Sequence, residues 1–123
     1  MAKYDLLDLP PKELLKYLFT EFNKESDKVP RDIETVDDMI AARRKMLRFS
    51  AEYSYLVELL SCAKIMTREL KRTGTKEEYE DMIDRREVIA NCLSMVDKKY
   101  TAISRVVTIK QECNRELNMQ QVA

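Results

Sequence analysis

Histidine and tryptophan are absent from this chain of 123 residues, and glycine occurs only once. Without histidine there is no His-based acid–base catalysis, no Ser–His or Cys–His nucleophile pair and no ordinary zinc site. Because the turns of β-sheet proteins usually need residues that tolerate a positive φ, a single glycine also argues against a β-rich fold. No apolar run approaches roughly 18 residues, so we expect no membrane span and no membrane partner.

The three cysteines form no recognisable motif. Cys62, Cys92 and Cys113 are an odd number, widely spaced and without a CxxC pair, which is typical of a reduced compartment. The N-terminus lacks the uninterrupted apolar stretch of a signal peptide. We therefore expect a cytoplasmic protein in which all three cysteines are buried as small hydrophobic side chains.

Charge is abundant but balanced, with 22 Lys and Arg residues against 22 Asp and Glu residues. A net charge of zero gives no overall field that favours nucleic acid or membrane, so any electrostatic function must be local. The hydrophobic content of 45% argues against disorder. A chain of this length suffices for one modest core, and we expect residues 1–123 to form a single domain without a cofactor.

Two long segments carry apolar residues at alternating steps of three and four. The first stripe contains Ala42, Met46, Phe49, Tyr53, Leu56, Leu60, Ala63, Thr67 and Leu70, and the second contains Ile89, Leu93, Val96, Tyr100, Ile103 and Val107. This spacing predicts helices over about 36–72 and 76–117. Residues 100–111 are rich in β-branched side chains, but they lack the period of two typical of a strand. Their lower helix propensity amounts to only tenths of a kcal/mol per residue.

A short turn separates the two long helices. We predict that Gly74 ends the first of them in the left-handed conformation, and Thr75 and Glu78 have the spacing of a capping box. Two helices joined in this way must form an antiparallel hairpin. A short helix at about 11–25 and a polar connector at 26–35 precede the hairpin, so the predicted fold is all-α.

The second long helix has another apolar stripe beside the first, interrupted by Lys99. Its members are Val88, Cys92, Met95, Ala102, Val106, Ile109 and Cys113. Two adjacent stripes are wider than one partner helix covers, and the short helix spans about three turns against about eleven. We therefore expect a homo-oligomer that completes a helical bundle, with an interface formed by Tyr100, Ile103, Val106, Val107 and Ile109.

Basic residues cluster in two parts of the chain that the hairpin brings together. We call them the basic patch, and they are Arg43, Arg44, Lys45, Arg48, Lys98, Lys99 and Arg105. No acidic residue lies within 39–51 or 98–111, and the tyrosines at 53, 55 and 100 are expected to flank the patch. It is either a solvated face or a site for a phosphate backbone or an acidic protein.

No residue pattern indicates catalysis or a metal site. Ser61 and Lys64 have the spacing S-x-x-K, but they lie in the middle of a predicted helix. The carboxylates between Glu77 and Glu87 lack the further oxygen ligands that Mg²⁺ needs.

We expect a non-enzymatic protein-binding module, such as an adaptor, regulator or inhibitor, because the apolar face is wide and seven methionines suit adaptable surfaces. Its partner is a second copy or another protein with an acidic or apolar surface. The alternative is a nucleic-acid-binding accessory protein, of single-strand or recombination type, that uses the basic patch and stacks bases on tyrosines. Small, charge-balanced helical chains are common among phage and mobile-element accessory proteins, which is an association rather than a motif.

Overall fold

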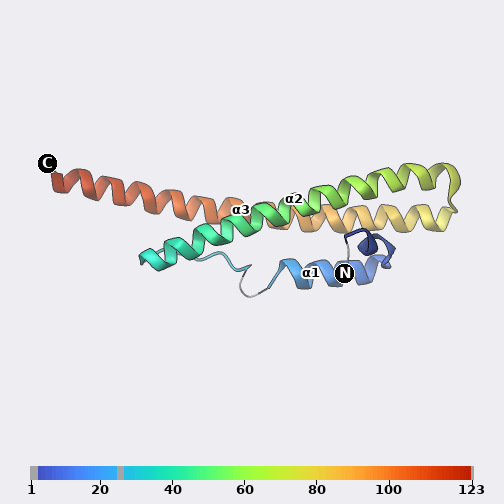
Figure 1. Ribbon diagram of the computed structural model, residues 1–123, viewed down its shortest axis with the longest axis horizontal. Coiled ribbons are helices and arrows are strands. Elements are labelled where there is room, and N and C mark those ends of the chain that lie inside the picture. The colour runs from blue at the N-terminus through green and yellow to red at the C-terminus, as the bar shows by residue number, and fades with distance from the viewer. Residues whose placement is uncertain (1–2, 25–26, 123) are drawn as a thin grey trace.

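The computed structural model describes residues 3–24 and 27–122, and every regular element in these ranges is helical (Figure 1). A 3₁₀ helix, η1 (Lys3–Asp8), is followed by α1 (Pro11–Phe22), α2 (Val36–Thr73) and α3 (Lys76–Val122). The predicted all-α fold, a long helical hairpin with a short N-terminal helix, is confirmed.

Helix α2 begins where its local sequence satisfies the free backbone amides. The Asp38 amide donates to Thr35 Oγ1 at 3.0 Å, and the Thr35 amide donates to Asp38 Oδ2 at 3.1 Å, which completes a capping box. The backbone hydrogen bonds from Thr35 and Glu34 lower the pKa of the Asp38 carboxyl. Lys71 and Arg72 lie in the last turn, where the helix dipole favours positive charge.

The turn between the long helices needs glycine because there is no room for a side chain at this position, and not because the backbone is left-handed. Gly74 has φ −91° and ψ 172°, so the predicted left-handed conformation is wrong. A Cβ atom at Gly74 would lie 2.7 Å from Leu70 Cδ2 and 2.9 Å from Leu70 O, closer than real Cβ contacts. The next helix starts with the predicted capping box, in which the Glu78 amide donates to Thr75 Oγ1 at 3.1 Å.

The core lies along the seam between α2 and α3. From α2 it takes Phe49, Leu56, Leu59 and Ala63, and from α3 it takes Ile89, Val96, Ile103 and Val107. Each large apolar side chain buried in this way contributes roughly 1.5–3 kcal/mol of transfer free energy. The placement corrects one expectation: Ile103 and Val107 are only 0% and 5% exposed, because their stripe faces α2. They are not available for an interface on the outside of the hairpin.

Helix α1 packs against α3 and runs parallel to it (Figure 1). Leu14 and Leu18 are buried, and two side chains of α3 donate hydrogen bonds to the ends of α1. Arg85 Nε donates to Leu9 O at 2.7 Å just before the helix, and Lys99 Nζ donates to Phe22 O at 3.2 Å at its end.

The N-terminal third differs in two ways from the expectation. Helix α1 ends at Phe22 rather than near residue 25, and beyond it the Asp27 amide donates to Lys24 O at 2.8 Å. The helix η1 was not anticipated, and it buries Leu6 and Leu7.

Helix α3 extends to Val122, beyond the predicted end near residue 117. Its C-terminal part continues past the start of α2, where no other helix of the described residues lies beside it (Figure 1). We call residues 109–120 the arm. All of them are exposed apart from the half-buried Lys110.

Candidate functional site

Three members of the basic patch bind the chain's own N-terminal third. Lys45 Nζ donates to Lys28 O at 2.8 Å, and Lys99 Nζ donates to Asn23 Oδ1 at 2.8 Å as well as to the end of α1. Arg48 forms an ion pair with Asp27, with 2.5 Å between Nη2 and Oδ1. Lys45 and Arg48 thus hold the connector against the hairpin and Lys99 holds the end of α1, so these three cations form less of an outward-facing patch than expected.

The ion pair of Arg48 belongs to a partly buried cluster of charges. Asp27 is 2% exposed, and Glu52 lies beside Arg48 with 3.9 Å between Nε and Oε1. The other carboxylate oxygen of Glu52 is buried and has no hydrogen-bond partner among the described residues. Burial, and then the negative charge of Asp27, raises the pKa of Glu52 to about 7, although Arg48 and Lys99 act in the opposite direction. Burial likewise raises the pKa of the Cys92 thiol to about 11.

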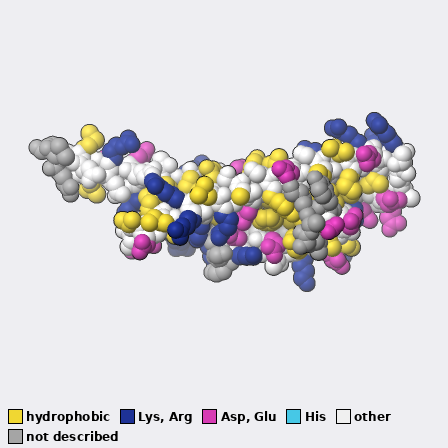
Figure 2. Space-filling view, in the orientation of Figure 1, with side chains coloured by type: hydrophobic (Ala, Val, Ile, Leu, Met, Phe, Trp, Pro, Cys, Tyr) yellow, Lys and Arg dark blue, Asp and Glu magenta, His cyan; other side chains and the backbone are white. Residues whose placement is uncertain are grey.

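The remaining members of the basic patch are exposed. They are Arg43, Arg44, Lys98 and Arg105. In Figure 2, Lys and Arg side chains lie among hydrophobic ones near the end of the hairpin where α2 begins.

The three tyrosines do not lie together. Tyr55 packs against Phe22 of α1, with ring centroids 6.1 Å apart. Tyr53 and Tyr100 instead line a separate hollow with Ser50 and Asp97. The expectation that all three flank one basic surface is therefore wrong, because their positions on the helices point to different sides of the hairpin.

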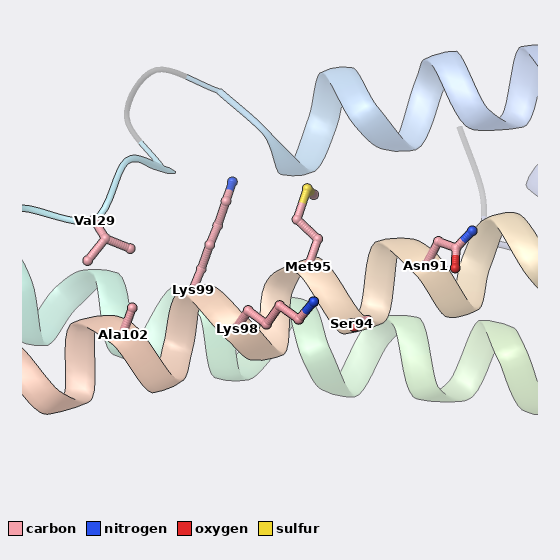
Figure 3. A pocket seen from close by; sticks show the side chains of 7 residues that line it. All are labelled: Val29, Asn91, Ser94, Met95, Lys98, Lys99 and Ala102. Atoms are coloured by element: carbon pink, nitrogen blue, oxygen red, sulfur yellow. The ribbon is translucent and has the colours of Figure 1, made fainter.

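A groove of about 510 Å³ lies between α3 and the connector (Figure 3). Asn91, Met95 and Lys99 project from α3 toward α1 and the connector, and Lys98 lies along the helix. The lining is Val29, Asn91, Ser94, Met95, Lys98, Lys99 and Ala102.

A second, more apolar hollow of about 150 Å³ adjoins the first and shares Asn91 and Met95 with it. It lies between α1 and α3, and its rim includes Leu15 and Phe19, which are 50% and 55% exposed. Together the two hollows form one surface along α3 from residue 88 to residue 102, which we call the α3 groove. At 1.5 Å per residue it is roughly 21 Å long.

The α3 groove was only partly visible in the sequence. Lys98 and Lys99 were predicted as site residues, whereas Leu15 and Phe19 were not. The signal was present, because the apolar residues of α1 form a stripe wider than a single partner helix covers. Only Leu14 and Leu18 of this helix are buried.

The other predicted interface residues are at least partly accessible. Tyr100 is 37% exposed, Val106 is half-buried and Ile109 is 60% exposed. Of the three cysteines only Cys92 is buried, whereas Cys62 is half-buried and Cys113 is exposed, which corrects the expectation that all three are buried. The reason is that Cys113 lies in the arm, beyond the reach of α2.

Within residues 3–24 and 27–122, no three acidic or cysteine side chains are grouped in a way that would hold a metal ion. None of the described helices is both long and apolar enough to cross a membrane. No protein-family model, curated protein or solved structure matches the chain.

Proposed function

We propose that this chain is a non-enzymatic protein-binding module that receives an amphipathic helix in the α3 groove. The observation that carries the proposal is the continuity of an apolar rim at Leu15 and Phe19 with a basic end at Lys98. Helices bind such grooves through apolar side chains at steps of three and four. A groove of roughly 21 Å accommodates about four helical turns.

The chemistry of the groove defines the partner. Its helix carries apolar residues on one face and carboxylates at the end that lies beside Lys98. Charge of this kind contributes mainly to the association rate and to the choice of partner. In this role the chain acts as an adaptor, regulator or inhibitor in the cytoplasm. We propose that it also self-associates, because the apolar face of α3 extends beyond the part that α1 covers.

The alternative of a nucleic-acid-binding accessory protein has less support. Three of the seven patch cations are engaged with the chain's own backbone or carboxylates. The three tyrosines do not form a common stacking surface, and the net charge is zero.

The proposal is tested by capturing partners on immobilised protein in cell extract, with and without nuclease. The groove variant is Leu15→Ser with Phe19→Ser, and Ile65→Ser is its control because Ile65 is also 55% exposed but lies on α2. We expect a protein that the wild type and the control retain and that the groove variant loses. Equal retention by the groove variant contradicts the proposal. Loss of capture after nuclease treatment, with a steep salt dependence, points to the nucleic-acid alternative.

A further inference from the structure

The arm of α3 carries a stripe of exposed apolar residues. Ile109, Cys113 and Leu117 follow one another at steps of four and are all exposed, with Ile109 at 60% and Leu117 at 56%. Glu112 and Glu116 lie in the same segment. The arm also contains Lys110 and Arg115, so it is an amphipathic helix of zero net charge, and no other described helix lies beside it.

This exposed stripe continues a surface that is covered elsewhere in the molecule. Upstream on the same face of α3, Val88 and Met95 line the hollow beside α1, and Ala102 lies beside Val29 of the connector. Past the connector, the stripe of Ile109, Cys113 and Leu117 has no such cover among the described residues. Single exposed apolar residues are common on protein surfaces, but a continuous row of them usually marks an interface.

The distribution of charge along α3 favours an antiparallel orientation of a second copy. Lys98, Lys99, Arg105 and Lys110 occur without an acidic residue in between, and beyond them two carboxylates accompany the single Arg115. The last turn of α3 has no basic residue to offset the negative end of the helix dipole. Antiparallel pairing brings this negative end beside the basic segment of the other copy, whereas parallel pairing places like charges together.

We propose that two copies of this chain pair through their arms, each arm lying antiparallel along α3 of the other copy. The inference rests on the self-association proposed above, and it names the arm as the surface through which a second copy binds. With the two-fold axis between residues 110 and 111, the last described turn of each arm lies opposite the partner's Ala102, at the basic end of the groove.

Two details of the sequence fit this register. Arg105 and Glu116 are equally far from the axis, so each Arg105 lies opposite the partner's Glu116. Within one chain, Arg105 and Glu116 are eleven residues apart, which is close to three full turns, so both lie on the same side of α3. Both can therefore face the second copy in an antiparallel pair. Along the paired helices, apolar residues from one copy alternate with apolar residues from the other copy. These residues are Val106, Ile109, Cys113 and Leu117.

The register also has one unfavourable contact, because the two copies of Lys110 lie close to the axis. Like charges that face each other across an interface are destabilising. Replacing Lys110 with glutamine is therefore expected to tighten the dimer, which is a result that general loss of structure would not give.

The test uses the full chain in sedimentation velocity over a range of concentrations up to tens of micromolar. We expect the wild type to dimerise, and Ile109→Asp to weaken the dimer at least tenfold. Ile65→Asp serves as the matched control of similar exposure on α2 and should leave the dimer unchanged. Circular dichroism at 222 nm shows whether each variant keeps its helices.

Charge exchange then tests the register. Arg105→Glu is expected to weaken the dimer severalfold, and adding Glu116→Arg to the same chain should restore it. A monomeric wild type overturns the inference, and so does a dimer that Ile109→Asp leaves intact or that the exchange fails to restore. None of these results affects the capture experiment with the groove variant, so failure of the arm pairing and failure of the groove proposal are distinguishable.

Discussion

Replacement of Glu52 by glutamine should make the stability of this protein nearly independent of pH between 5 and 8. In the folded chain the pKa of Glu52 is raised to about 7 from its ordinary value of 4.5, first by burial and then by the charge of Asp27. Between these two values the folded state binds a proton that the unfolded state has released. The contribution of Glu52 to the free energy of unfolding is therefore largest below pH 4.5, and this contribution is lost as the pH rises through 7.

The magnitude follows from the two pKa values. Each pH unit over which the folded state holds the extra proton corresponds to about 1.36 kcal/mol, which gives a loss of at most about 3 kcal/mol. For a domain of this size such a loss is on the order of 10 °C in melting temperature. The glutamine variant keeps the shape of the protonated side chain without its ionisation. It should match the wild type at pH 5 and be more stable by up to about 3 kcal/mol at pH 8.

The assay is thermal and urea unfolding followed by circular dichroism at pH 5, 6, 7 and 8, at one fixed protein concentration. The chain has no histidine, so the usual cause of a pH dependence in this range is missing. Glu87→Gln is the control, because Glu87 is exposed on α3, and it should retain the wild-type pH dependence. The reasoning is refuted if the wild type is equally stable at pH 5 and pH 8, or if the Glu52 variant loses stability like the wild type.

Three further substitutions test the fold. Gly74→Ala should destabilise the protein by about 1 kcal/mol or more in urea unfolding, because its Cβ would lie 2.9 Å from Leu70 O, and an unchanged midpoint would contradict this. Phe49→Ala should cost about 3–5 kcal/mol by the same measurement, since Phe49 is fully buried in the hairpin seam, and a loss below about 1 kcal/mol would place it outside the core. Lys99→Met should increase amide exchange in α1, because it removes the donor to Phe22 O, and unaltered exchange there would show that the bond does not hold the helix.

The hairpin was predictable because its signals are local. The start of α2 is encoded by Thr35 and Asp38, and the start of α3 by Thr75 and Glu78, each pair three residues apart. The long stripes between these caps repeat often enough to distinguish a helix from a strand in spite of the β-branched residues. The predicted bounds of α2 are correct to within one residue.

The rest depends on contacts between residues far apart in the sequence. Asp27 looked like one more charge in a polar connector, and only the folded chain brings it to Arg48. The exposed rim at Phe19 arises because α1 packs on one side of α3, which its own periodicity does not specify. Gly74 fitted a common pattern at helix ends, but a glycine also occurs where there is simply no room for a side chain.

The two hydrogen bonds from α3 to the ends of α1 have a consequence for the order of folding. Arg85 and Leu9 are 76 residues apart, and Lys99 and Phe22 are 77 apart. The helices α2 and α3 meet first at their turn, where contacts close only short loops. Docking α1 on α3 closes a much longer loop. This step becomes favourable once the hairpin holds Arg85 and Lys99 at the separation that matches the two ends of α1. We therefore expect the hairpin to act as a template on which α1 docks last, so that the groove beside it is completed in the final step of folding.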